Sequence, residues 1–171
     1  MIEHRFTVLC HDVTVDRDSN NLTLSRVFTS VKVQHPKPPE DDHAIGLMAS
    51  FHFFLVTAWG RADPAAGRAE FAYLKLVGPN GEDLLSMDYE VDLTASPVHH
   101  QRVEFTQMPM TDSGRYLFEV GRAELSAKGF LGYHTACHTV PLDVEINWVD
   151  GSAAEFGKVA PGLRTPGRPV G

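Results

Sequence analysis

The chain alternates apolar and polar side chains with a period of two, and no other feature restricts its fold as strongly. Between Val140 and Trp148 every even-numbered residue is apolar, and three of the odd-numbered residues are Asp, Glu or Asn. An extended strand places alternate side chains on opposite faces. Three further runs alternate in the same way, with apolar faces formed by Phe6, Val8 and Cys10, by Leu85, Met87, Tyr89, Val91 and Leu93, and by Tyr116, Phe118 and Val120. Because no stretch keeps helical periodicity over three turns, the sequence predicts an all-β protein.

Turn signals separate these runs. The strongest is Asn80-Gly81, because Asn-Gly accepts the positive φ angles of a tight hairpin turn. It is expected to join a strand at 68–77 to one at 84–93. A second hairpin loop at 16–21 is expected to lead into a strand at 22–34.

The strand expected at 22–34 changes its apolar phase along its length. Leu22 and Leu24 are even-numbered, whereas Val31 and Val33 are odd-numbered. A one-residue slip turns all later side chains to the other face of a sheet. We therefore expect a β-bulge near Ser25-Arg26.

Residues 44–60 form the longest segment almost without charge. Its 17 residues are fewer than the roughly 20 that a helix needs to cross a bilayer, so a buried central strand at 45–58 is expected. Phe54 and Val56 lie opposite the other apolar residues of this strand, so the strand is apolar on both faces. The other expected strands are 4–11, 98–107, 114–122 and 140–148, with a proline-containing crossing between sheets at 35–42.

About eight short strands with regular turns predict an immunoglobulin-like antiparallel β-sandwich over residues 1–150. Residues 151–171 are rich in Gly and Pro and predict a flexible tail, because they hold too few apolar groups to offset ordering entropy.

Asp112, Gly114 and Tyr116 have the D-x-G-x-Y spacing of a tyrosine corner. In immunoglobulin-like sandwiches this tyrosine hydroxyl bonds to the backbone just before its strand. The motif stands where a turn meets an alternating strand, so we expect a structural role.

Taken in order, these features resemble a bacterial family of small β-sandwich proteins known only as a domain of unknown function. The resemblance spans about residues 5–148 and is carried by Val8-Leu9-Cys10, Leu22-Thr23-Leu24, the 76–84 hairpin, Gly114-x-Tyr116-x-Phe118 and Val140-Pro141-Leu142. The chain departs from the family in a longer insertion between Gly121 and His138 and in the tail. The resemblance implies a sandwich fold and supplies no activity.

Charge and cysteine content restrict partners and location. Residues 1–150 carry 12 basic and 21 acidic side chains, and such an acidic body repels phosphate backbones, so no nucleic-acid partner is expected. The chain opens without a signal-peptide pattern. Two cysteines fit a reducing compartment better than a disulfide framework, so a cytoplasmic protein without a membrane association is expected.

Histidine and cysteine offer the one candidate metal centre. His134, Cys137 and His138 lie close in sequence, and His11 or Cys10 is a candidate fourth ligand for zinc. The alternative is that the histidines are ordinary polar loop residues and that the cysteines only pack. Because phosphate-loop, dinucleotide, nucleophile-elbow and metalloprotease motifs are absent, no catalytic residue and no cofactor are assigned.

Three functions stay open at this point. The leading hypothesis is a non-catalytic binding or assembly module whose partner is another protein or a second copy of the chain, since the central strand predicts a second apolar face. A metal-dependent enzyme would use the His/Cys cluster. A carbohydrate-binding sandwich would need exposed aromatic side chains, whereas Trp59 and Trp148 both have the phase of core residues.

Overall fold

The computed structural model describes residues 1–16, 21–37, 47–61, 70–94, 96–125 and 131–149. These residues form β1 (Ile2–Val15), β2 (Leu22–Val27), β3 (Ser30–Pro36), β4 (Leu47–Ala49), β5 (Phe53–Arg61), β6 (Glu70–Val77), β7 (Asp83–Val91), β8 (Val98–Phe105), β9 (Met108–Met110), β10 (Gly114–Leu125) and β11 (Leu131–Val149). The all-β prediction is confirmed. Within these ranges no helix is long and apolar enough to cross a membrane. The tail expected at 151–171 lies outside the described residues.

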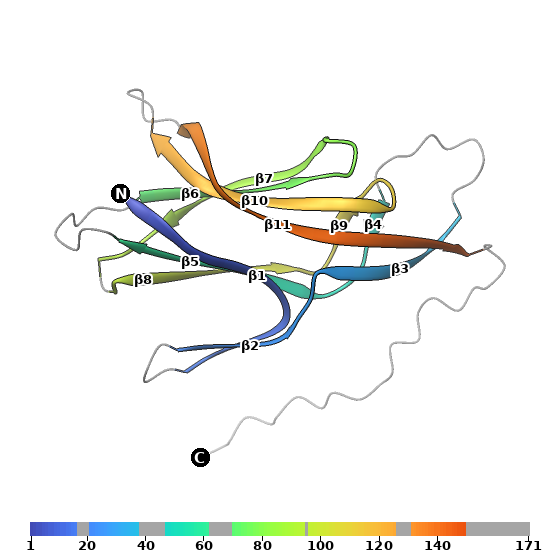
Figure 1. The fold of residues 1–171 in the computed structure, drawn as a ribbon, viewed down its shortest axis with the longest axis horizontal. Coiled ribbons are helices and arrows are strands. Elements are labelled where there is room, and N and C mark those ends of the chain that lie inside the picture. The colour runs from blue at the N-terminus through green and yellow to red at the C-terminus, as the bar shows by residue number, and fades with distance from the viewer. Residues whose placement is uncertain (17–20, 38–46, 62–69, 95, 126–130, 150–171) are drawn as a thin grey trace, which may run out of the picture.

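Two large sheets contain nine of these strands. The four-stranded sheet has the order β2-β1-β5-β8, and the five-stranded sheet has the order β3-β11-β10-β6-β7; β4 and β9 form a separate pair. Figure 1 shows β1, β5 and β8 on one side of the molecule and β6, β7, β10 and β11 on the other. The two sheets face each other across one core, because Leu9 and Leu55 belong to the same buried cluster as Leu74 and Leu142.

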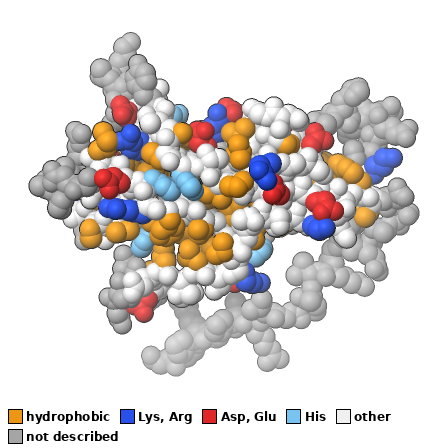
Figure 2. All heavy atoms as spheres, in the orientation of Figure 1, with side chains coloured by type: hydrophobic (Ala, Val, Ile, Leu, Met, Phe, Trp, Pro, Cys, Tyr) orange, Lys and Arg blue, Asp and Glu red, His pale blue; other side chains and the backbone are white. Residues whose placement is uncertain are grey.

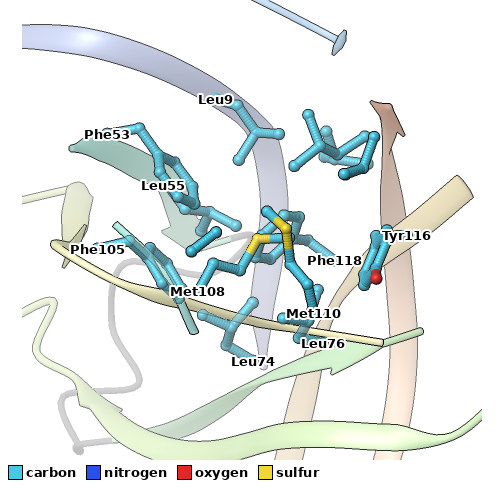
Figure 3. Packing of buried hydrophobic residues seen from close by; sticks show 14 of the residues in the cluster. Leu9, Phe53, Leu55, Leu74, Leu76, Phe105, Met108, Met110, Tyr116 and Phe118 are labelled. Carbon is cyan, nitrogen blue, oxygen red and sulfur yellow. The ribbon is translucent and has the colours of Figure 1, made fainter. Parts of the chain in front are cut away.

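Aromatic rings occupy the centre of this core. Phe53 stacks on Phe105 with ring centroids 4.7 Å apart, and both rings meet Phe118 of the opposite sheet nearly edge to face. Figure 3 shows Met108 and Met110 of β9 inside the same cluster. Full burial of each large apolar side chain stabilises the fold by about 1.5–3 kcal/mol, so this contact between sheets dominates the packing.

The apolar face predicted for the first strand is wrong. Phe6 and Val8 are half-buried on the outer face of the four-stranded sheet, whereas Leu9, of opposite parity, enters the core. The β1–β5 register shifts between His4 and Phe6. Since residues 8–10 are all apolar, alternation alone does not identify the face that meets the other sheet.

The single strand expected at 22–34 is two strands in different sheets. β2 pairs with β1, and after Phe28 the chain crosses to the five-stranded sheet as β3. The β1–β2 register shows no shift near Ser25, although Arg26 adopts a φ of 55°. The change of apolar phase therefore reflects the change of sheet and not a bulge in one ladder.

Other predicted strands also divide or lengthen. The expected strand at 45–58 is β4 followed by β5, whereas the one at 98–107 is the single strand β8. In the segment between Gly121 and His138, residues 122–125 continue the pairing of β10 with residues 131–135 of β11. The expectation of a wholly antiparallel arrangement fails at one pair, because β3 runs parallel to β11.

Within the run predicted at 140–148, now part of β11, the first four apolar residues lie on the predicted core face, but Trp148 does not. Val140, Leu142, Val144 and Ile146 are buried, but Trp148 is 43% exposed. Near the end of the strand its ring meets the ring of His35 from β3 at 5.8 Å. Trp59, by contrast, is fully buried, as its phase predicts.

The turn at 78–82 and the start of β10 form one structural unit. Gly81 adopts a φ of 84°, and its amide donates to the carbonyl of Gly78. The Asn80 side chain reaches Asp112 at 3.4 Å. Gly114 has a φ of 153°, and a side chain there would collide with Pro79. Both glycines are therefore required by backbone conformation or close approach.

Tyr116 ties this unit to the core. Its ring is fully buried, and its hydroxyl donates to the carbonyl of Asp112 at 2.8 Å. The same oxygen accepts hydrogen bonds from the amides of Thr111 at 2.9 Å and Asp112 at 3.2 Å. This is the arrangement that the D-x-G-x-Y spacing predicts.

Replacing Tyr116 with Phe is expected to lower the free energy of unfolding by about 1–3 kcal/mol, because two backbone amides and a carbonyl lose a buried partner. Urea denaturation followed by circular dichroism measures the change. A loss below about 0.5 kcal/mol would show that the hydroxyl does not anchor this corner.

Candidate functional site

The outer face of the four-stranded sheet is apolar at its centre. Strand pairing sets Val8 beside Val56 and Phe6 beside Ala58, with Phe54 next along β5. We call these five residues the apolar outer face. They belong neither to the core described above nor to a smaller core cluster of Ile2, Trp59, Ala72, Val91 and Leu93, so they lie on the side away from the other sheet. Figure 2 shows hydrophobic side chains gathered where Figure 1 places β1, β5 and β8.

Larger side chains partly cover the middle of this face. Val56 and Ala58 are buried, whereas Phe6, Val8 and Phe54 are only half-buried. These three side chains therefore keep part of their apolar area exposed. A sheet in a water-soluble protein normally carries polar residues on such a face.

Charged groups border the apolar outer face. The Arg102 guanidinium lies 5.3 Å from the centre of the Phe54 ring, a cation–π arrangement. Glu104, opposite Phe54, pairs with His52 at 2.8 Å, and Arg26 pairs with Asp12 at 2.6 Å. The face therefore has an apolar centre and a polar border with charges of both signs.

Cys10 lies next to Phe54 across the β1–β5 pair and is fully buried. Burial, together with the nearby Asp12 carboxylate, raises the pKa of its thiol. A thiol with a raised pKa stays protonated at neutral pH and is a poor nucleophile and metal ligand. Cys10 therefore contributes packing and not reactivity.

Hydrogen-bonded polar side chains lie between the two sheets near the start of β1. The His4 ring contacts the Thr7 hydroxyl at 2.7 Å, and the Thr7 hydroxyl donates to Thr57 at 3.2 Å. Nearby, the Trp59 indole donates to the Tyr89 hydroxyl at 3.0 Å. Burial raises the pKa of Tyr89 to about 12, so it stays protonated. These contacts satisfy polar groups that would otherwise be buried without partners.

His4 also connects the two sheets directly. Its ring stacks on His138 of β11 with centroids 4.9 Å apart and an interplanar angle of 20°. Burial, followed by repulsion from His138, lowers the pKa of His4, and a backbone hydrogen bond with Phe6 opposes this effect. The stacked arrangement is therefore most favourable when at least one of the two rings is neutral, because two positive rings would repel each other.

A separate polar network lies on the outer face of the five-stranded sheet. His134 pairs with Asp88 at 3.0 Å, and its ring lies 4.5 Å from the ring of Tyr73. Tyr73 donates to Glu119 at 2.6 Å, and burial followed by this carboxylate raises the pKa of Tyr73. The network pairs all four side chains and leaves no open group.

The structure does not assemble the predicted zinc ligands. His134, Cys137 and His138 lie on strand β11 and not on a loop, with His134 held by Asp88 and His138 stacked on His4. His11 contacts Phe28 and the His52 carbonyl in another part of the molecule. Within the described ranges, no three His, Cys, Asp or Glu residues are grouped to hold a metal ion.

Sequence patterns missed the polar side chains between the sheets. Thr7 and Thr57 are buried at 7% and 0% exposure, although apolar residues surround both in the sequence. Arg122 follows Val120 on the same face of β10, so it too points toward the opposite sheet. The sequence signal for such positions is a polar residue at a place where the alternation of the strand predicts a core-facing side chain.

No protein-family model matches the chain, and no curated protein matches it either. The resemblance to a bacterial family therefore stays a prediction.

The His4 contact makes the stability of the fold depend on pH. Because the pKa of His4 is lowered in the folded state, the unfolded chain binds more protons below its ordinary value of 6.5. The group that faces His4 from the other sheet is His138 of β11, and its proximity opposes protonation of His4. Wild type is expected to lose stability between about pH 7.5 and about pH 5.5, and His4→Gln is expected to lose less.

Urea midpoints at both pH values measure this difference. His35→Gln is the matched control, because His35 lies beside Trp148 and its substitution should leave the pH dependence unchanged. If His4→Gln and wild type lose equal stability between these two pH values, the stacked histidines do not cause the pH dependence of the free energy of unfolding.

Proposed function

We propose that the protein is a non-catalytic binding or assembly module, and that the apolar outer face is its contact surface. The observation that carries this proposal is the half-buried set of Phe6, Val8 and Phe54 on the outer face of the four-stranded sheet. Contiguous exposed apolar area on a folded domain is typical of an interaction surface. An apolar centre with a charged border is also the usual anatomy of a protein interface.

The partner that this face fits best is a second copy of the chain. A two-fold axis along the strands, between β1 and β5, would set β1 of one copy over β5 of the other. Apolar residues would then meet apolar residues, and Arg102 on β8 would approach the side of the partner that carries Asp12. Self-complementarity of this kind is what an isologous dimer requires.

The other two functions have less support. The proposal of a metal-dependent enzyme has little support, because its candidate ligands do not come together in the structure. These are His134, Cys137, His138 and His11. A carbohydrate-binding sandwich would need a platform of exposed aromatic rings. Trp148 is exposed, contrary to the prediction. The ring that contacts it is that of His35, so this pair does not supply the second large aromatic ring that such a platform needs.

We further propose an immunoglobulin-like sandwich as the detailed fold, supported by the facing sheets and the Tyr116 corner. A bacterial origin and a cytoplasmic location are part of the same proposal. Cys10 and Cys137 are both free thiols, which fits a reducing compartment, and the net charge of −7 argues against a nucleic-acid partner.

Val8→Lys tests the contact surface. The outward side chain can extend its amine into solvent in a monomer, but a dimer would bury that charge. Wild type is expected to reach the dimer mass in light scattering, and Val8→Lys is expected to dissociate at least about tenfold more readily. Circular dichroism checks that the variant is folded.

Thr139→Lys is the matched control, since it adds the same charge opposite Glu119 on the five-stranded sheet and should leave dimerisation unchanged. A wild-type protein that stays monomeric up to about 1 mM would contradict the dimer. So would a folded Val8→Lys variant that dimerises as well as wild type.

A further inference from the structure

Arg122 is a half-buried cation on the inner face of the five-stranded sheet, and its Nε group lacks a hydrogen-bond partner. It pairs with Ala72 of β6, a fully buried residue of the smaller core cluster, so its side chain starts on the side that faces the other sheet. Its Nε atom is buried and has no hydrogen-bond partner, and no ion pair involves this residue in the described part of the chain. A buried N–H group without a hydrogen-bond partner is costly, so this group needs an explanation.

The carboxylates at this end of the molecule do not neutralise Arg122. Glu70 is two residues before Ala72 on β6, but it accepts from the Ile2 amide at 2.8 Å and pairs with the Met1 amine at 3.1 Å. Glu124 follows two residues after Arg122 and is exposed. Arg61, at the end of β5, adds a further positive charge to the same end.

Hydrogen-bond donors lie next to Arg122. Thr135 is its direct neighbour on β11 and is exposed. His138 pairs with Val120, two residues before Arg122 on the same face, and same-face neighbours on a strand are about 7 Å apart. The exposed His138 ring stacks on His4 and makes no hydrogen bond within the described ranges.

We propose that Arg122, Thr135 and His138 form a binding site for a small oxyanion, a phosphate or carboxylate group, at the open edge between β1 and β11. The guanidinium supplies a charge-assisted hydrogen bond, which an oxyanion accepts in the geometry that Arg favours. The Thr135 hydroxyl and a ring N–H of His138 supply two further hydrogen-bond donors. A bound anion provides the counter-charge that the protein itself does not place beside Arg122.

The proposed site also links protonation of the stacked histidines to anion binding. Without an anion, a second positive charge on the His4–His138 pair is unfavourable, which agrees with the lowered pKa of His4. A bound oxyanion favours the protonated imidazole, so binding takes up protons and tightens as the pH falls through the histidine range. The other charged residues on the strands at this end are Arg122 on β10, Glu70 on β6, which is held by Ile2 and Met1, and Arg61 on β5, which has contacts of its own.

Inorganic phosphate and acetate are the probes, each titrated into the full chain at constant ionic strength set with sodium chloride. Histidine ring signals followed by NMR are expected to shift and saturate with at least one anion, with a dissociation constant of about 1–10 mM. Phosphate as the tighter ligand would identify a phosphate site, and acetate as the tighter ligand would identify a carboxylate site.

Arg122→Gln is the decisive variant. Because it removes an unpaired charge, it should fold and be at least as stable as wild type without anion. It is expected to bind at least about tenfold more weakly and to lose the rise in melting temperature that the anion causes. Arg115→Gln is the matched control, since Arg115 pairs with Asp143 on the outer face and should leave binding intact.

Two results would overturn the proposal. One is the absence of a saturable shift with either anion in the wild-type protein. The other is an Arg122→Gln variant that binds as tightly as wild type, because the anion would then lie elsewhere. Neither result bears on the dimer contact, since none of these residues belongs to the apolar outer face.

Discussion

The structure depends on apolar contact between two sheets, centred on Phe53, Phe105 and Phe118. These rings come from both sheets and pack within 6.1 Å of one another, with Leu and Met side chains around them. Neither sheet can bury its apolar side chains alone, so the strands are stable only in this paired arrangement. Every other feature, including the outer face and the polar end, is positioned by this contact.

The two faces of β5 explain why the molecule has a candidate contact surface at all. Its inner residues Phe53 and Leu55 satisfy the core, yet Phe54 and Val56 are equally apolar and face outward. At the other end the situation is reversed, because polar groups such as Thr7, Thr57 and Arg122 point between the sheets. Hydrogen bonds compensate the threonines, while Arg122 lacks compensation. An apolar group outside and a charged group inside deviate from the usual placement of apolar residues in the core and charged residues in solvent, and both proposals start from these positions.

Local chemistry made several features predictable. The Gly81 turn and the Tyr116 corner follow from backbone conformation and short spacing, so neighbouring residues were sufficient to place them. The candidate contact surface was visible as the two apolar faces of the central strand. The metal centre failed because nearness in sequence is a poor guide on a strand, where His134 and His138 turn to opposite sides across a bulge at Cys137. The division of 22–34 between two sheets was missed because a phase change looks the same for a bulge and for a change of sheet.

By itself, the sequence determined that the protein is made of strands, where its tightest turn lies and which tyrosine anchors a corner, because these depend on alternation and on residues close in the chain. Only the tertiary structure decided which face of β1 meets the core, that β3 runs beside β11, that Trp148 is exposed, and that Arg122 stands near His138 without a counter-charge. The physical reason is that a period of two separates the faces of a strand but carries no information on which strand lies beside it or which sheet lies opposite.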